Sequence, residues 1–207
     1  MARFIIAITR TCGSGGTTIG KILSNDLEIN MYDRELLRLA SEDSGISEAL
    51  FANADETVKN SLLYKVSKKV YDGELIPPES NDFTSNDNLF NYQAKILREL
   101  SERESYVVIG RCADYILKDY PNVFKIFIHA PHEYCVKHQM ENLRISEKEA
   151  IKQIKKLDKY RREYYYYHTG MKWENAKNYD LCLDTSKLGF EKCAEYIKDY
   201  IKLRMDL

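Results

Sequence analysis

A short run of small residues near the start of the sequence has the composition of a phosphate-binding turn. Its glycines let backbone N–H groups come close to phosphate oxygens, and the N-terminus of a following helix adds positive partial charge. The turn follows an apolar run at residues 4–8 and leads into an amphipathic pattern from residue 17. We predict that it binds nucleotide phosphates, and a tight turn without a ligand is the alternative interpretation. The candidate phosphate-binding residues are Gly13, Ser14, Gly15, Gly16, Thr17 and Thr18.

Two positions depart from the usual motif, in which a lysine reaches the terminal phosphates. Gly16 stands where that lysine is expected, and Arg10 stands where the first glycine is expected. Arginine binds phosphate through two N–H groups, so Arg10 could fold over the phosphates and replace the missing charge as a catalytic residue. Alternatively, Arg10 points to solvent and the turn binds nucleotide weakly. Thr17 keeps the hydroxyl at the position that binds Mg²⁺ in such turns.

The composition indicates a globular protein of one domain. The chain has 207 residues, 44% of them apolar, and a formal net charge of -1 at pH 7. This length supports a substantial core, and the near-zero charge disfavours a nucleic-acid partner. The opening apolar run is too short for a signal peptide or a membrane span, so we expect no membrane partner. The five cysteines show no paired spacing, which predicts neither disulfides nor a zinc site and favours the cytoplasm.

Apolar runs alternate with helical patterns along the chain. Because three of the five runs are continuous or nearly so, they are typical of strands covered on both faces. Strands that alternate with helices form βαβ units and a parallel sheet, so the expected fold class is α/β. The expected strands span residues 4–8, 29–32, 106–109, 124–128 and 179–183. The expected helices span residues 17–27, 34–41, 56–70, 86–102, 131–143, 146–170 and 189–204.

Two segments interrupt this alternation. Residues 42–85 hold one helical pattern and then a long polar loop at 72–82, and loops of this length are usually functional or disordered. Residues 144–178 are highly charged and then rich in tyrosine. The four tyrosines at 164–167 cannot all face one side of a helix, so some rings must pack inward while others remain exposed. Core packing or a subunit contact is their expected use, and stacking on a nucleobase is the alternative.

Several further motifs follow the glycine-rich turn along the chain. Tyr-Asp occurs at 32–33, Gly-Arg-Cys-Ala-Asp at 110–114, an arginine-bearing segment at 157–162 and Tyr-Tyr-x-x-x-Thr-Gly at 164–170. With the runs at 123–131 and 179–186, these motifs cover nearly the whole chain. The ordered set resembles the cytidylate kinase-like family, a branch of the nucleoside monophosphate kinases.

The resemblance implies a three-layer α/β/α P-loop fold with a five-stranded parallel sheet, formed as a single domain over residues 1–207. It implies phosphoryl transfer from ATP, with Mg²⁺ as cofactor, to a nucleoside monophosphate, and CMP or dCMP is the default acceptor. The segment at about 34–88 would bind the acceptor, and the segment at about 144–178 would form a lid. The expected partners are a nucleotide and a small-molecule acceptor, and homo-oligomer formation stays open.

The expected lid carries charged residues one helical turn apart. Asp158 precedes Arg161 and Arg162 by three and four positions, so its carboxylate can orient a guanidinium group. By resemblance to the arginine-bearing lid of the family, these three residues are candidate catalytic residues that stabilise the transferred phosphoryl group. A charged helix face that is merely solvated is the alternative interpretation.

A candidate acceptor-binding pair follows the second expected strand. Asp33 and Arg34 lie where the family begins its acceptor-binding segment. Aspartate at the start of a helix also caps backbone N–H groups, so Asp33 could be a helix N-cap. Both interpretations stay open, and they are compatible with each other.

A second candidate acceptor site follows the third expected strand. Arg111 is the best candidate for holding the acceptor phosphate. Related cytidylate kinases flank this Gly-Arg step with acidic residues, whereas Ile109 and Cys112 occupy those positions here. Asp114 is the nearest carboxylate, and its spacing from Arg111 suits one helix face, so it joins the candidates. A surface ion pair between Arg111 and Asp114 is the alternative.

Three functional hypotheses remain. The first is a kinase that phosphorylates a nucleoside monophosphate. The second is a nucleotide-binding protein that has lost catalysis and acts as a sensor or partner-binding module, which the missing lysine and acids favour. The third is a kinase for a non-nucleotide metabolite, in which the polar loop reshapes the acceptor pocket.

Overall fold

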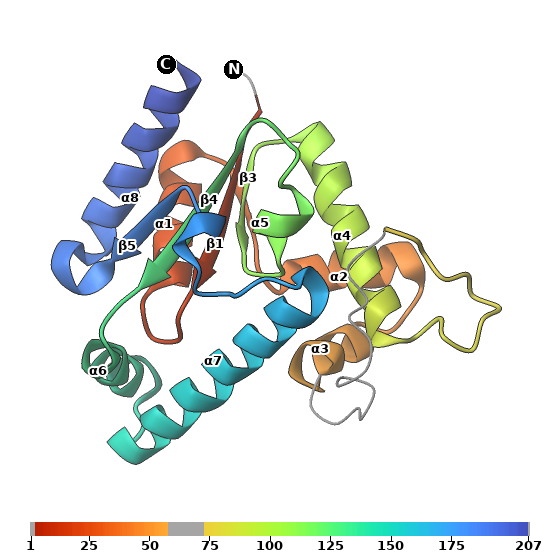
Figure 1. The fold of residues 1–207 in the computed structure, drawn as a ribbon, viewed down its shortest axis with the longest axis horizontal. Coiled ribbons are helices and arrows are strands. Elements are labelled where there is room, and N and C mark those ends of the chain that lie inside the picture. The colour runs from red at the N-terminus through yellow and green to blue at the C-terminus, as the bar shows by residue number, and fades with distance from the viewer. Residues whose placement is uncertain (1–2, 58–72, 207) are drawn as a thin grey trace.

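A parallel sheet forms the centre of the molecule (Figure 1). The computed structural model describes residues 3–57 and 73–206. The five strands are parallel and lie in the order β2-β3-β1-β4-β5. They are β1 (Ile5–Arg10), β2 (Asn30–Tyr32), β3 (Tyr106–Ile109), β4 (Val123–His129) and β5 (Leu181–Asp184). The α/β class and all five expected strands are confirmed, with small shifts at the strand ends.

Helices cover both faces of this sheet, as expected from the alternating pattern. The α-helices of the described residues are α1 (Gly16–Leu27), α2 (Glu35–Ser44), α3 (Glu48–Thr57), α4 (Asn86–Arg103), α5 (Ala113–Ile116), α6 (His132–Leu143), α7 (Glu147–Thr169) and α8 (Thr185–Met205). A short 3₁₀ helix, Ala176–Asn178, precedes β5. The three-layer α/β/α arrangement is therefore confirmed.

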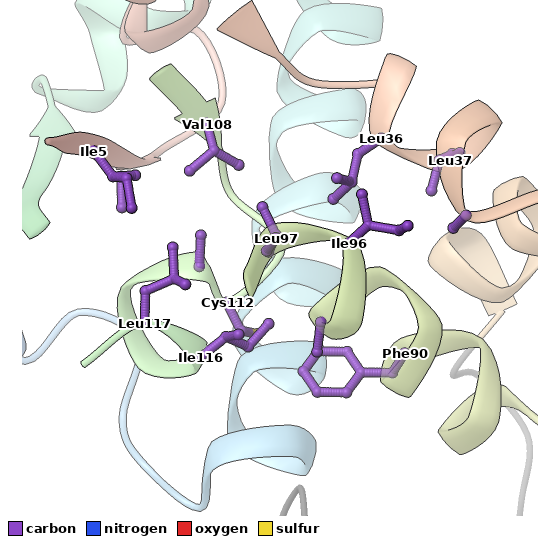
Figure 2. Packing of buried hydrophobic residues seen from close by; sticks show 14 of the residues in the cluster. Ile5, Leu36, Leu37, Phe90, Ile96, Leu97, Val108, Cys112, Ile116 and Leu117 are labelled. Atoms are coloured by element: carbon purple, nitrogen blue, oxygen red, sulfur yellow. The ribbon is translucent and has the colours of Figure 1, made fainter. Parts of the chain in front are cut away.

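The strands separate two hydrophobic cores, because successive side chains of a strand point to opposite faces. Ile6 and Ile8 of β1 belong to the core that α1 and α8 cover. Ile5 and Ala7 belong to the core that α2, α4 and α5 cover, and Figure 2 shows these helices converging on the sheet. The central strands β1, β3 and β4 are buried on both faces, which explains why they are mostly apolar, whereas the edge strands β2 and β5 are partly exposed.

Most of the expected helices are confirmed, with several differences. The sequence pattern predicted neither α3 nor the short α5, and the helix expected over 56–70 falls largely on residues 58–72, outside the described residues. The last helix begins at Thr185 instead of 189, because the Asp184 carboxylate caps it by accepting a hydrogen bond from the Ser186 N–H at 2.9 Å. Gly189, with φ 77°, then interrupts the helix where the pattern placed its start.

The polar loop before α4 is held by side chains of that helix. Asn88 is fully buried, accepts a hydrogen bond from the Ile76 N–H at 2.8 Å and donates to the Phe83 carbonyl at 2.7 Å. Asn91 donates to the Glu74 carbonyl. Residues 73–85 form turns rather than helix or strand, as expected, but they are fixed to the body of the protein through α4.

Helix α7 crosses the edge of the sheet at which the strands end (Figure 1). Ser146 and Glu149 form a capping box at its N-terminus, which explains why the helix begins there. Among its tyrosines, Tyr165 is 3% exposed and Tyr166 is 40% exposed, so the expectation of inward and outward rings is confirmed. None of the helices in the described ranges combines the length and apolar character that a bilayer crossing requires.

Helix α8 also fixes the glycine-rich turn. The buried Thr185 hydroxyl donates to the Ser14 carbonyl at 2.9 Å, with the His129 carbonyl 3.4 Å away. The buried Ser14 hydroxyl lies 2.8 Å from the Thr11 carbonyl and 3.1 Å from the Ile128 carbonyl. The turn is therefore tied to the ends of β4 and β5 as well as to β1.

We expect Thr185→Val to lower the free energy of unfolding by about 1–3 kcal/mol, because the buried Ser14 carbonyl loses a hydrogen-bond donor while the side-chain shape is kept. Urea denaturation followed by circular dichroism measures this loss. Thr84→Val, at an exposed position of the loop before α4, is the matched control and should change stability by less than about 0.5 kcal/mol. Equal stability of the two variants would show that the Thr185 hydroxyl does not hold the turn.

Candidate active site

The glycine-rich turn presents the N-terminus of α1 without a side-chain cap. Gly13 and Gly15 have φ values of 83° and 84°, a left-handed conformation that glycine adopts without strain. Gly15 is the N-cap of α1, and no side chain of the described residues caps this end, whereas serines cap α4 and α7. The first N–H groups of a helix lack intrahelical partners. They can therefore bind an anion, as predicted for this turn.

A cavity of about 600 Å³ lies next to this turn at the carboxyl ends of β1 and β3. The structure brings six of the predicted site residues together on its wall: Arg10, Thr17, Asp33, Arg34, Arg111 and Arg161. Other predicted residues do not line it, namely Gly13, Ser14, Gly15, Gly16, Thr18, Asp114, Asp158 and Arg162. The cavity thus gathers four arginines beside one hydroxyl of the turn. Such a surface favours a ligand that carries several negative charges.

An unusual backbone turn delivers Arg111 to the cavity. Gly110, Arg111 and Cys112 have φ values of 74°, 61° and 53°, and the Ala113 N–H closes the turn on the Gly110 carbonyl at 3.1 Å. For a residue with a Cβ atom, this left-handed conformation costs about 1–2 kcal/mol. Residues held in such conformations cluster at functional sites, where the surrounding structure maintains them.

Arg10 lies at the end of β1 among other charged groups. Burial and the positive charges of Arg161 and Arg111 lower the pKa of Arg10 from its usual value, Asp33 opposes this fall, and the resulting pKa is about 9. Arg161 also donates a hydrogen bond to the Arg10 carbonyl at 3.3 Å. A pKa of about 9 keeps Arg10 protonated at pH 7, so the cavity wall carries an excess of positive charge.

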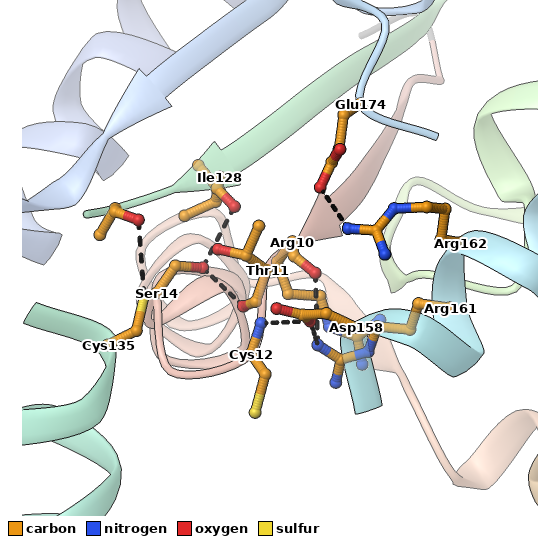
Figure 3. Close-up of polar contacts among 11 residues, drawn as sticks. Arg10, Thr11, Cys12, Ser14, Ile128, Cys135, Asp158, Arg161, Arg162 and Glu174 are labelled. Atoms are coloured by element: carbon orange, nitrogen blue, oxygen red, sulfur yellow. Dashed lines mark hydrogen bonds and ion pairs between the residues drawn. The ribbon is translucent and has the colours of Figure 1, made fainter. Parts of the chain in front are cut away.

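The lid candidates separate into two directions (Figure 3). Asp158 accepts a hydrogen bond from the Cys12 N–H at 2.8 Å and lies 3.4 Å from the Arg161 guanidinium, so α7 is joined to the turn. Arg162 instead pairs with Glu174 at 2.8 Å, and its side chain is 50% exposed compared with 22% for Arg161. The spacing of one turn between Asp158 and a guanidinium therefore forms a contact, but only with Arg161.

Asp114 differs from the expectation of a surface group. It is 3% exposed and accepts a hydrogen bond from the Tyr165 hydroxyl of α7 at 2.6 Å. Burial raises the pKa of Asp114 to about 6, although the bond from Tyr165 opposes this rise. The interpretation of Asp114 as half of a surface ion pair with Arg111 is wrong, because α5 and α7 enclose the carboxylate.

The interpretation of Asp33 as a helix N-cap is also wrong. Arg34 is the N-cap of α2, and no side chain among the described residues forms a hydrogen bond that caps this helix. The Asp33 side chain lies on the cavity wall instead. Its role in binding an acceptor stays a prediction.

Sequence reasoning missed several residues of the cavity wall. Glu48 and Ala52 belong to α3, which the pattern did not predict, and Lys156, Tyr160 and Tyr164 belong to α7. The spacing of four between the three α7 residues places them on one helix face, and this signal could have identified them. Trp173 is 3% exposed and also lines the cavity.

The donor set suits a magnesium ion shared with phosphates. The described residues contain no group of three or more His, Cys, Asp or Glu side chains that could enclose a metal. Mg²⁺ commonly keeps several waters and binds through few protein ligands together with substrate phosphates. The Thr17 hydroxyl on the cavity wall, next to the N-terminus of α1, fits that manner of binding.

The chain is similar to kinases over nearly its whole length. Residues 5–187 match the model of the cytidylate kinase-like family. A cytidylate kinase from Fervidobacterium nodosum is 26% identical over 228 residues, which cover 96% of each chain. A solved structure of an uncharacterized protein from Eubacterium ventriosum is 27% identical with a TM-score of 0.70, over 97% of this chain and 99% of that one. Shikimate kinase from Bacteroides thetaiotaomicron, 14% identical with a TM-score of 0.52 over 99% of both chains, shares the fold.

The buried Asp114 carboxylate predicts a pH dependence of stability. Its pKa is about 6 in the folded protein and near 3.8 when unfolded, so the unfolded chain loses this proton first as the pH rises. As the pH rises from 4 to 6, the free energy of unfolding of the wild type should therefore fall, whereas that of Asp114→Asn should not show this fall. We expect the variant to gain about 2–3 kcal/mol relative to wild type between pH 4 and 7.

Urea denaturation at pH 4, 5, 6 and 7 measures this difference. Asp119→Asn, at an exposed position near the end of the segment after α5, is the matched control and should show no such trend. A stability difference between Asp114→Asn and wild type that does not change with pH would contradict the raised pKa.

Proposed function

Because the chain belongs to the cytidylate kinase-like family, we propose that it transfers a phosphoryl group from ATP to a nucleoside monophosphate, with CMP or dCMP as the acceptor. One observation carries the proposal. A cavity lined by arginines adjoins the uncapped N-terminus of α1 at the carboxyl ends of β1 and β3. Two phosphorylated ligands can thus meet at one edge of the sheet, which is where α/β folds bind their ligands.

The residues of the chain divide the work of binding between donor and acceptor. The turn at 13–18 binds the donor phosphates through backbone N–H groups, and Thr17 would hold Mg²⁺, which would neutralise charge on these phosphates. Arg161 lines the cavity from α7 and stabilises the charge that moves with the phosphoryl group. Asp158 keeps Arg161 in place and joins α7 to the turn through the Cys12 N–H.

The acceptor side combines positive charge with aromatic rings. Arg34 and Arg111 suit a phosphate group, since a guanidinium can donate two parallel hydrogen bonds to it. Tyr160, Tyr164 and Trp173 line the same cavity and suit a planar base. The similarity to a cytidylate kinase supports cytosine as that base. The acceptor-binding segment of the one domain would then span about residues 34–88, and its lid about residues 144–178.

The free cysteines agree with a place in the cytoplasm.

A nucleotide-binding protein without catalysis is the second candidate function. Gly16 at the position of the motif's lysine favours it, because that lysine contributes to charge neutralisation in related sites. The arginines on the cavity wall favour catalysis instead. The two candidates differ in one observable property, since only a kinase consumes ATP in the presence of an acceptor.

We expect MgATP to raise the melting temperature, because a ligand that binds only the folded state stabilises it. In a coupled assay of ADP release, CMP and dCMP should be phosphorylated faster than UMP, AMP, GMP or shikimate. Binding of MgATP without turnover of any acceptor would support the second candidate function. The absence of any melting shift at millimolar MgATP would refute both.

The two arginines of α7 should differ strongly in their effect on turnover. We expect Arg161→Ala to lower kcat by about 10³-fold, because this guanidinium lines the cavity and stabilises transferred charge. Arg162→Ala, the matched control on the next residue, removes an exposed pair with Glu174 and should change kcat less than about 5-fold. Equal losses in steady-state kinetics of the two variants would contradict the assigned roles.

A further inference from the structure

The side chain of Arg10 occupies the space that a side chain at position 16 would need. A Cβ atom added to Gly16 would lie 2.5 Å from the Arg10 Cβ and 2.8 Å from its Cγ. Real Cβ atoms do not come this close to other carbon atoms, so a lysine at position 16 and an arginine at position 10 exclude each other. The two departures from the usual phosphate-binding motif are therefore one coupled exchange.

The guanidinium of Arg10 ends on the side of β3, away from the glycines of the turn. The Arg10 Nη1 atom lies in close contact with the position that a Cβ atom on Gly110 would take, and the Arg10 Cζ lies 3.5 Å from that position. A Cβ atom added to Gly13 would contact Cys135, and one added to Gly15 would contact Phe190, rather than Arg10. Gly110 thus admits the guanidinium, and the arginine stem passes over Gly16 on its way there.

Positive charge accumulates where the guanidinium ends. Arg111 follows Gly110 directly, and Arg161 reaches the Arg10 carbonyl from α7. The charges of both arginines oppose that of Arg10, and Asp33 is the acid that supports it. All four of these residues line the cavity. Cations brought together and partly buried are costly unless an anion lies between them.

We infer that Arg10 binds the anionic group of the acceptor, a phosphomonoester, rather than the terminal phosphates of the donor. This inference rests on the proposed function. In the usual motif a lysine at position 16 would place its positive charge over the donor phosphates. Here the positive charge belongs to Arg10, which extends from the end of β1 toward the acceptor side. Gly16 and Gly110 are the positions that make room for it.

Equilibrium binding to Arg10→Ala, measured by calorimetry, separates the acceptor side from the donor side. We expect the affinity for CMP, and for inorganic phosphate added to protein saturated with MgADP, to fall at least 10-fold. The affinity for MgADP should change less than 3-fold, and Arg10→Lys should restore part of the phosphate affinity. Lys21→Ala, an exposed basic position on α1, is the control and should change none of these values.

The outcomes distinguish this inference from the proposed function. The inference would be overturned if Arg10→Ala lost as much affinity for MgADP as for CMP or phosphate. It would also be overturned if the wild type bound neither CMP nor phosphate. Both results would hold against it even if the wild type is an active kinase. Phosphate binding that depends on Arg10 in a protein that phosphorylates no acceptor would support the inference and refute the proposed function.

The exchange itself is tested by restoring the lysine. Gly16→Lys alone should lower the melting temperature, because the new side chain meets Arg10. In an Arg10→Gly background the same lysine has room, so the double variant should recover at least half of that loss. Additive losses in melting temperature would show that positions 10 and 16 are independent. Circular dichroism at 20 °C confirms that the variants compared are folded.

Discussion

The active-site end of the sheet is organised around a partly buried guanidinium group. Arg10 stays charged at the end of β1, although burial and two neighbouring arginines lower its pKa. Its stem excludes a side chain at Gly16, and its tip lies against Gly110. The left-handed turn that begins at Gly110 then brings Arg111 to the same cavity. One side chain thus contacts the backbone at the ends of two strands.

Helix α7 connects the parts that this charge cluster brings together. Near its middle, Asp158 accepts a hydrogen bond from the glycine-rich turn through Cys12. Two turns later, Tyr165 donates to Asp114 behind β3. These two residues are about 10 Å apart along the helix axis. One helix therefore contacts both the glycine-rich turn after β1 and the segment after β3.

The sequence was sufficient to predict the fold class and the five strands, and six of the site residues proposed from it line one cavity. Apolar runs and a glycine-rich turn are determined by residues that are neighbours in the sequence, so they can be recognised from a single sequence. It could not predict that Arg161 enters the cavity while Arg162 faces Glu174, because the two are neighbours with the same chemistry. The burial of Asp114 was equally hidden, since it depends on the packing of α7, which lies far away in the chain. Helix α3 lacks a strong periodic pattern, so its share of the cavity wall was also missed.

The steric coupling between positions 10 and 16 has an evolutionary consequence. A chain that carries arginine at position 10 cannot accommodate a lysine at position 16 by one substitution, because the lysine would meet the arginine stem. Losing the arginine first would remove charge before any replacement exists. Each order of the two substitutions therefore passes through a chain that carries either both side chains, which collide, or neither of them. A change from one form to the other requires both positions to change together.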